Sequence, residues 1–207
     1  LILSFFTLIG CHKSVKVVSG DSSNAINKSY PNEAQSENLI KPYKKELDAQ
    51  MNEVIVVCSE EMPREKGQPE TKLGNLVADL SYKVASEMYE GDLDFCLLNF
   101  GGLRTNLPKG EITRGKVYEL MPFENELVVI TISEEKLLEL FQYLKRVGGQ
   151  PISGFEIEFS RDENDNLENF AGGELKMLFD KNGDGSFKVL TTDYLANGGD
   201  NMVFFAD

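Results

Sequence analysis

The sequence predicts a single α+β domain built on a mixed β-sheet. Helix-like and strand-like segments alternate in part, whereas runs typical of hairpins dominate the C-terminal third of the chain. The clearest buried strand is residues 93–98, which leads directly into Asn99. A doubly wound sheet needs helices and strands to alternate throughout, so a mixed sheet is the better prediction. The clearest helix is residues 72–89, whose apolar residues recur at steps of three and four: Leu73, Leu76, Val77, Leu80, Val84 and Met88.

The remaining elements follow from the same periodicities. A short helix is expected at residues 40–51. A longer helix is expected between Ser133, which can cap it, and the glycine pair Gly148-Gly149. The apolar stripe of this longer helix is predicted to be Leu137, Leu138, Phe141 and Leu144. The other predicted strands are residues 53–59, 126–132, 155–159, 175–179 and 188–192.

Residues 180–185 match the opening of an EF-hand calcium loop. The twelfth position of such a loop should be a bidentate Glu, but it is Thr191 here, and the flanking residues are strand-like. We therefore expect a hairpin turn at residues 182–185 and no calcium site.

Residues 1–11 have the features of a bacterial lipoprotein signal peptide that ends at its lipobox cysteine. The apolar run is too short to span a bilayer, and Leu8 to Cys11 matches a lipobox. We expect cleavage before Cys11 and a lipid on its thiol, which would tether the protein to the extracytoplasmic side of a membrane. Residues 12–39, rich in Ser, Asn, Glu and Lys, are predicted to be a flexible tether to a domain at 40–207. The alternative for the apolar run is an ordinary buried strand or helix.

Composition argues against several functions. The net charge of −13 disfavours nucleic acid as a partner, because phosphate backbones attract clusters of Lys and Arg. The only histidine, His12, lies in the predicted tether, so the domain cannot assemble a histidine-based triad or a dimetal hydrolytic centre. We therefore predict no catalytic residue, metal ligand or cofactor in this chain. Cys58 and Cys96 lie in apolar runs, where they either pair or, as we favour, stay unpaired in the core.

Two glycine-rich segments, far apart in the chain, have a similar design. One runs from Asn99 to Arg104 and contains Gly101-Gly102, and the other runs from Tyr194 to Asp200. Glycine pairs let a ligand approach the backbone, a ring offers a stacking face, and a carboxylate accepts hydrogen bonds from sugar hydroxyls. Arginine adds a planar set of donors for phosphate or carbonyl oxygens. Together the segments suggest a nucleotide-binding surface, although each alone is more often a tight turn, and Phe123 alone is more often a core residue.

Six short motifs follow one another along the chain, and their combination is more informative than any one of them. They are Leu73-Gly74-Asn75-Leu76-Val77-Ala78-Asp79, Asn99-x-Gly-Gly-x-Arg104, Gly110-x-Ile112-Thr113, Pro122-Phe123-x-Asn125, Ser153-Gly154 and Tyr194-x-x-Asn-Gly-Gly-Asp200. Their order and spacing resemble the C-terminal domain of 5'-nucleotidases, from about Glu53 to the C-terminus. The resemblance implies the α+β fold of that domain, which binds the nucleoside part of the substrate and rotates to deliver it. It also implies that hydrolysis belongs to a separate calcineurin-like domain that carries two metal ions.

The resemblance also implies a role for each matched residue. Phe123 and Tyr194 would sandwich the base, and Asp200 would hold the ribose hydroxyls. Asn99 would contact the base, and Arg104 would lie near ribose and phosphate. The expected substrate-binding residues are Asn99, Gly101, Gly102, Arg104, Phe123, Tyr194, Asn197, Gly198, Gly199 and Asp200.

Three positions depart from the family pattern. The family usually has a further substrate arginine just before the Leu73 motif, where this chain has residues 66–69 and the nearest arginine is Arg64. Tyr194 stands where Phe is common, which keeps the ring face and adds a hydroxyl. Asn201 replaces the usual glycine.

These observations lead to one main hypothesis and two alternatives. The chain is expected to be the nucleoside-binding half of a split 5'-nucleotidase, with a separate calcineurin-like metallophosphoesterase chain that supplies the divalent metal pair. The first alternative is a stand-alone lipoprotein that captures nucleosides without catalysis. The second is a diverged scaffold that has lost ligand binding.

Overall fold

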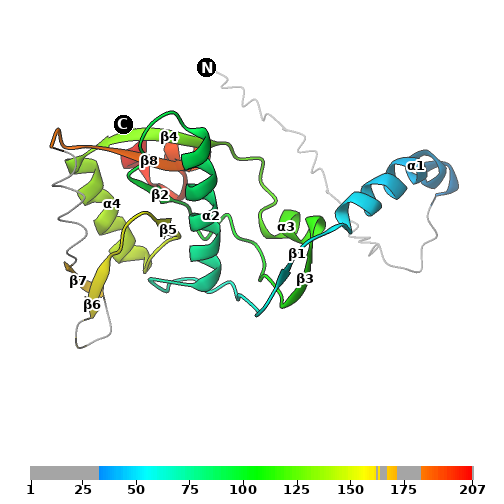
Figure 1. Ribbon diagram of the computed structural model, residues 1–207, viewed down its shortest axis with the longest axis horizontal. Helices are drawn as coiled ribbons and strands as arrows, with labels where there is room; N and C mark the ends of the chain where they lie inside the picture. The colour runs from blue at the N-terminus through cyan, green and yellow to red at the C-terminus, as the bar shows by residue number, and fades with distance from the viewer. Residues whose placement is uncertain (1–32, 162, 164–166, 172–182, 207) are drawn as a thin grey trace, which may run out of the picture. The chain divides into compact units, whose positions relative to one another are not determined.

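The computed structural model describes residues 33–161, 163, 167–171 and 183–206, in two units that comprise residues 1–42 and 43–207 (Figure 1). The first element, α1 (Ala34–Met51), begins earlier than the helix expected at residues 40–51. Glu33 caps its first turn, because the Glu33 carboxylate accepts hydrogen bonds from the backbone N–H groups of Gln35 (3.0 Å) and Ser36 (2.6 Å). The bonds from Ser36 and Gln35 lower the pKa of the Glu33 carboxyl. The predicted tether is therefore helical from Ala34 onwards.

The predicted signal peptide, including Cys11, lies outside the described residues, and so does His12. Within the part of the chain that the structure describes, no helix is both long and apolar enough to cross a bilayer.

The predicted mixed sheet is confirmed. Its four strands lie in the order β4 (Leu127–Ser133), β8 (Ser186–Thr192), β2 (Phe95–Leu97) and β5 (Ile152–Ser153). β2 runs parallel to β8, whereas β4 pairs with β8, and β5 with β2, in antiparallel fashion. The carboxyl ends of β2 and β8 therefore lie at the same edge of the sheet, and the segments that follow these strands start close together.

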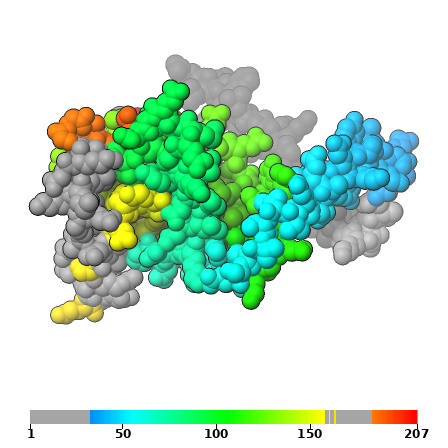
Figure 2. Space-filling view, viewed as in Figure 1, coloured from blue at the N-terminus to red at the C-terminus, as the bar shows by residue number. Residues whose placement is uncertain are grey.

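Two helices cover opposite faces of this sheet. α2 (Lys72–Met88) contacts β2 and β5 and lies on the face turned towards the viewer in Figures 1 and 2. α4 (Glu134–Val147) packs on the other side. Successive side chains of a strand point to opposite faces, and β2 follows this rule. Phe95 and Leu97 belong to the apolar cluster of α4, whereas Cys96 belongs to that of α2.

The ends of both helices agree with the sequence. The Thr71 hydroxyl accepts a hydrogen bond from the Gly74 N–H (3.0 Å) at the start of α2. Ser133 caps α4 as predicted, by accepting a bond from the Lys136 N–H (3.3 Å). α4 ends at Gly148, whose left-handed φ of 83° favours glycine.

The predicted apolar stripes are only partly buried. In α4, Leu138 is 51% exposed, and Leu140 is fully buried in its place. Leu140 lies three residues after Leu137 and four before Leu144, so it shares their face. In α2 the fully buried residues all lie in the N-terminal half, whereas Tyr82 and Ala85 in the C-terminal half are only partly buried against the core. The exposed apolar residues of α2 are Leu80, Val84 and Met88.

A small second sheet has one strand before α2 and one after it. β1 (Val54–Cys58), predicted at residues 53–59, pairs antiparallel with β3 (Gly110–Thr113). β3 runs into α3 (Arg114–Leu120), which Thr113 caps by accepting a bond from the Lys116 N–H. Neither β3 nor α3 was expected from the sequence. Each has seven residues or fewer, too short to show a clear period.

The strand predicted at 155–159 is misplaced. The observed strand is β6 (Glu158–Arg161), which pairs antiparallel with β7 (Leu167–Ala171). Phe155 instead packs edge-on against Phe95, with ring centroids 4.9 Å apart. The strand predicted at 175–179 lies outside the described residues.

The segment that matched the start of an EF-hand is described only from Gly183 onwards. The Asp184 carboxylate accepts hydrogen bonds from the N–H and the hydroxyl of Ser186, both at 2.9 Å. These bonds lower the pKa of the Asp184 carboxyl and tie it to the turn that enters β8.

Cys58 and Cys96 are unpaired, and Cys96 is fully buried. Burial raises the pKa of the Cys96 thiol to about 12, and the nearby Asp79 charge adds to the shift.

Candidate functional site

The two glycine-rich segments meet at the edge of the sheet where β2 and β8 end. Asn99 follows β2, and Asp200 lies in the 3₁₀ turn η1 (Gly199–Asn201). The Asn99 Nδ2 atom donates a hydrogen bond of 2.6 Å to Asp200 Oδ2. Asn99 is only 6% exposed, so its amide is a fixed part of the fold. The parallel pairing of β2 with β8 explains why side chains so far apart in sequence come together.

Tyr194 forms the other side of the Asp200 carboxylate. It lies in α6 (Asp193–Ala196), which directly follows β8. Its hydroxyl donates to Asp200 Oδ1 (3.0 Å) and accepts from the Asp200 N–H (3.1 Å). Each carboxylate oxygen of Asp200 therefore has one donor from within the protein. Asn99, Tyr194 and Asp200 together form a cluster, referred to below as the Asp200 cluster.

Close packing explains why positions 101 and 199 are glycine. A Cβ on Gly101 would lie 2.9 Å from Asn99 Nδ2 and 3.0 Å from Asp200 Oδ2. A Cβ on Gly199 would lie 2.5 Å from carbons of the Tyr194 ring. Both distances are too short for a side chain, so glycine is required for the Asp200 cluster to close.

The other predicted residues of the glycine-rich segments lie around the same cluster. A Cβ on Gly102 would lie 3.1 Å from Asn99 Oδ1. Gly198 has a left-handed φ of 86° and begins η1. The Asn197 side chain donates to the Asp193 carbonyl (2.7 Å), so its amide holds the end of α6 rather than Asp200.

Phe123 and Arg104 lie against each other. The guanidinium carbon of Arg104 is 5.7 Å from the centroid of the Phe123 ring, and Arg104 Nη1 donates to the Gly101 carbonyl (3.4 Å). Phe123 is 51% exposed, which rules out the alternative of a core residue, and Tyr194 is 46% exposed. Both rings therefore present apolar area that a ligand could cover.

A cavity of about 110 Å³ lies beside Phe123 and is also lined by Asn99, Gly102 and Asn125. Cavities that enclose a small molecule are usually several times larger, about 300–1,000 Å³. This cavity is therefore too small to enclose a small molecule, and a ligand here would lie largely on an open surface.

Two residues that sequence analysis did not place in the site support its loops. Arg64 Nε donates to the Leu103 carbonyl, and Arg64 Nη2 donates to the Phe100 carbonyl (3.3 Å). Gln150 Oε1 accepts from the Phe100 N–H (2.9 Å). Both lie more than 35 positions from their partners, and no local pattern in one sequence signals such a contact. Arg64 therefore holds the loop through its Nε and Nη2 atoms.

Tyr143 lies behind the same loop. Its hydroxyl accepts a hydrogen bond from Gln150 Nε2 (3.2 Å). Burial raises the pKa of the Tyr143 hydroxyl, the bond from Gln150 lowers it in part, and the Asp200 charge raises it further.

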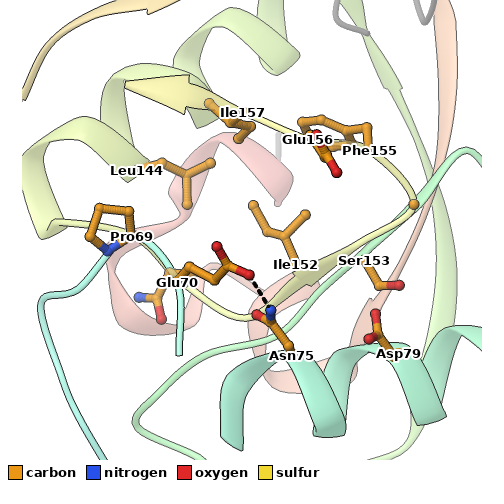
Figure 3. Close-up of a pocket in the computed structure, with 13 residues that line it drawn as sticks. Pro69, Glu70, Asn75, Asp79, Leu144, Ile152, Ser153, Phe155, Glu156 and Ile157 are labelled. Carbon is orange, nitrogen blue, oxygen red and sulfur yellow. Dashed lines mark hydrogen bonds between the residues drawn. The ribbon is translucent and has the colours of Figure 1, made fainter. Parts of the chain in front are cut away.

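The larger cavity, of about 510 Å³, lies elsewhere and contains none of the predicted site residues (Figure 3). Glu70, Asp79 and Glu156 line it, and Glu70 accepts a hydrogen bond of 2.6 Å from Asn75 Nδ2. None of the described lining residues is Lys, Arg or His. Its carboxylates would repel a phosphate ester, so cavity size does not indicate the nucleotide site.

Among the described residues, no group of three or more His, Cys, Asp or Glu side chains could hold a metal ion.

Comparison with known proteins identifies the domain. A family model described as "5'-nucleotidase, C-terminal domain" matches residues 51–207. A 5'-nucleotidase of Vibrio parahaemolyticus is 26% identical over 78% of this chain, and this chain spans 28% of that protein. The trifunctional nucleotide phosphoesterase protein YfkN of Bacillus subtilis is 30% identical over 67% of this chain, which spans 10% of it.

The fold is shared with a solved structure. The 5'-nucleotidase precursor from Thermus thermophilus superimposes with a TM-score of 0.62 at 24% identity, over 86% of this chain and 36% of that one. The predicted α+β fold of this domain type is thereby confirmed. The chain belongs to the family of 5'-nucleotidase C-terminal domains.

Proposed function

We propose that this domain binds the nucleoside part of a nucleotide, and that a separate dimetal phosphoesterase chain hydrolyses the phosphate ester. The observation that carries the proposal is the Asp200 cluster, which holds a carboxylate beside the exposed Tyr194 ring, while the exposed Phe123 ring lines the same cavity as Asn99. A carboxylate with aromatic rings nearby is suited to a ligand that has both a sugar and a base.

Each site residue has a physical role in this proposal. Phe123 and Tyr194 stack on the base, and stacking is typically worth about 1–3 kcal/mol per base. Asp200 accepts hydrogen bonds from the ribose hydroxyls. Arg104, which is exposed and lies over the Phe123 ring, has the donors to contact ribose or phosphate oxygens.

One observation motivates a catalytic centre outside this sequence. Hydrolytic dimetal sites usually contain several histidines, and this sequence has only His12. The partner in this proposal is a calcineurin-like metallophosphoesterase that supplies the two divalent metal ions.

A hydrolysis assay tests this division of labour. The purified chain is incubated with AMP and Mn²⁺, alone and with a metallophosphoesterase chain from the same cell. We expect phosphate release only in the mixture. Robust turnover by the chain alone would contradict the proposal.

The proposed location is the extracytoplasmic side of a bacterial membrane, with a lipid on Cys11. The lipobox at Leu8 to Cys11 supports this. Wild-type protein expressed in bacteria should partition into detergent, and Cys11→Ser should remain in the aqueous phase. Equal partitioning of both proteins would contradict lipidation.

A second candidate function is capture of nucleosides without catalysis. It is favoured by the fact that every residue of the Asp200 cluster comes from this chain, so the sugar-binding group needs no partner to form. Nucleoside binding that persists while no phosphoesterase chain restores AMP hydrolysis would support this candidate over the split enzyme.

A further inference from the structure

The Asp200 carboxylate is held from both sides. Asn99 donates to Oδ2 at 2.6 Å, and the Tyr194 hydroxyl donates to Oδ1 at 3.0 Å. An ionised carboxylate has about four acceptor positions, two on each oxygen. One acceptor position on each oxygen is therefore left over by these two bonds, and Asp200 is only partly buried, so solvent or a ligand can supply further donors.

The Asp200 backbone needs this support. Asp200 has φ 50° and ψ 28°, and Asn201 has φ 65°, so two successive residues other than glycine adopt the left-handed conformation. This conformation is uncommon outside glycine, although Asp and Asn adopt it more readily than other residues do. The Tyr194 hydroxyl helps to hold it, because it accepts a bond of 3.1 Å from the Asp200 N–H.

The Tyr194 ring is also fixed. Gly199 lies so close to it that a Cβ there would be 2.5 Å from the ring carbons. The hydroxyl is thus directed at Asp200 by packing as well as by hydrogen bonding. A phenylalanine ring would keep the packing and lose both hydrogen bonds to Asp200.

We propose that the Tyr194 hydroxyl is a positioning group for sugar selection: it presets the Asp200 carboxylate so that each oxygen accepts one hydroxyl of a vicinal diol. This inference rests on the proposed nucleoside-binding function. It adds to that function a second role for Tyr194, separate from ring stacking.

The test separates the ring of Tyr194 from its hydroxyl. Calorimetry measures the Kd of adenosine and of 2',3'-dideoxyadenosine for the full-length wild-type chain and for Tyr194→Phe. We expect Tyr194→Phe to weaken adenosine binding about tenfold, the loss expected for one hydrogen bond to a charged group. Binding of the dideoxy ligand should change by less than about twofold, because the stacking ring is unchanged.

Matched variants complete the design. Tyr118→Phe removes a hydroxyl from a tyrosine that is 60% exposed on α3, and should leave both Kd values unchanged. Asp200→Asn removes the charge that accepts the diol, and should abolish discrimination between the two ligands. This variant keeps the test decisive if Tyr194→Phe does not fold.

The possible failures are distinguishable. If the wild type binds neither ligand, the proposed function is wrong, and this inference is wrong with it. If both ligands bind and Tyr194→Phe changes their affinities equally, the hydroxyl has no role in sugar selection and this inference alone is overturned. Tighter adenosine binding by Tyr194→Phe would also overturn it, since the hydroxyl would then compete with the diol. The inference would also be overturned if Asp200→Asn still bound adenosine more tightly than 2',3'-dideoxyadenosine.

Discussion

Asn99 and Asp200 are joined by a 2.6 Å hydrogen bond between side chains that lie 101 positions apart in the sequence. The bond connects the loop after β2 to the turn after α6, and it is accepted by a carboxylate. Hydrogen bonds to charged groups are stronger than neutral ones, about 1.5–3 kcal/mol each. This contact therefore contributes both to the stability of the domain and to the geometry of its site.

Replacing Asn99 should reveal both contributions. We expect Asn99→Ala to lower the free energy of unfolding by about 1–3 kcal/mol, because a nearly buried amide is lost and Asp200 Oδ2 loses its donor. Urea denaturation measures the change, and adenosine affinity should fall as well. Unchanged stability together with unchanged affinity would show that the bond contributes little to either.

Gly199 should tolerate no side chain. A Cβ at this position would lie 2.5 Å from the Tyr194 ring, so Gly199→Ala must displace the ring from Asp200. We expect a loss of about 1–3 kcal/mol in stability, which is typical of overpacking, with loss of adenosine binding. Gly183→Ala is the matched control, because a Cβ there meets no atom within 4 Å. Equal thermal stability of the two variants would contradict the packing argument.

Arg64 should act on the loop and not on the ligand directly. Arg64→Ala removes donors from the Leu103 and Phe100 carbonyls, so amide hydrogen exchange across residues 99–104 should become faster. Arg114→Ala serves as the control, because Arg114 pairs with Glu53 on the surface and should leave exchange in this loop unchanged. If amide exchange across residues 99–104 is no faster in Arg64→Ala than in the wild type, the loop does not depend on Arg64.

Cys96 should be inert in the folded protein. Its pKa of about 12 means that almost no reactive thiolate forms at pH 8, and its side chain is fully buried. Alkylation with iodoacetamide followed by peptide mapping should label Cys58 and leave Cys96 unlabelled until denaturant is added. Rapid native labelling of Cys96 would contradict its burial.

The same raised pKa makes stability depend on alkaline pH. The folded pKa of Cys96 lies above its ordinary value of 9.0, so the folded state retains a proton that the unfolded state releases. The associated stability is complete below pH 9 and falls as the pH rises towards 12. Tyr143, whose pKa is also raised by burial, acts in the same direction above pH 10. Denaturation midpoints should therefore fall across this range, and Cys96→Ala should make the fall shallower.

Long elements were predictable from this sequence because their periodicity is strong. The periodic run of α2 and the Ser133 cap of α4 placed both helices correctly. Leu138 was wrongly assigned to the core, because apolar side chains at 137, 138, 140 and 141 admit more than one stripe and only the sheet selects among them. α1 was placed too late, since the cap is Glu33, which is not a typical N-cap residue.

The glycine pairs and the order of motifs single out Asn99, Phe123 and Asp200 as expected binding residues from the sequence alone. The structure brings Asn99 and Asp200 into contact, and the binding role of all three stays a prediction. The two hydrogen bonds between Tyr194 and Asp200 depend on the left-handed backbone conformation of residues 200–201. The residue pattern of the sequence does not predict that conformation. The role of Arg64 depends on its contacts with the backbone carbonyl groups of Leu103 and Phe100. Every residue has a backbone carbonyl, so the sequence does not indicate which ones Arg64 contacts.

The central claim is that this domain binds nucleosides through the exposed ring of Phe123 and the Asp200 cluster. Titration of adenosine into the wild type, Phe123→Ala and Tyr43→Ala by calorimetry tests it most directly, because Tyr43 is also exposed but lies on α1. We expect the wild type and Tyr43→Ala to bind adenosine with the same Kd, and Phe123→Ala to bind it at least about tenfold more weakly. Absence of binding by the wild type, or equal affinity in all three proteins, would contradict it.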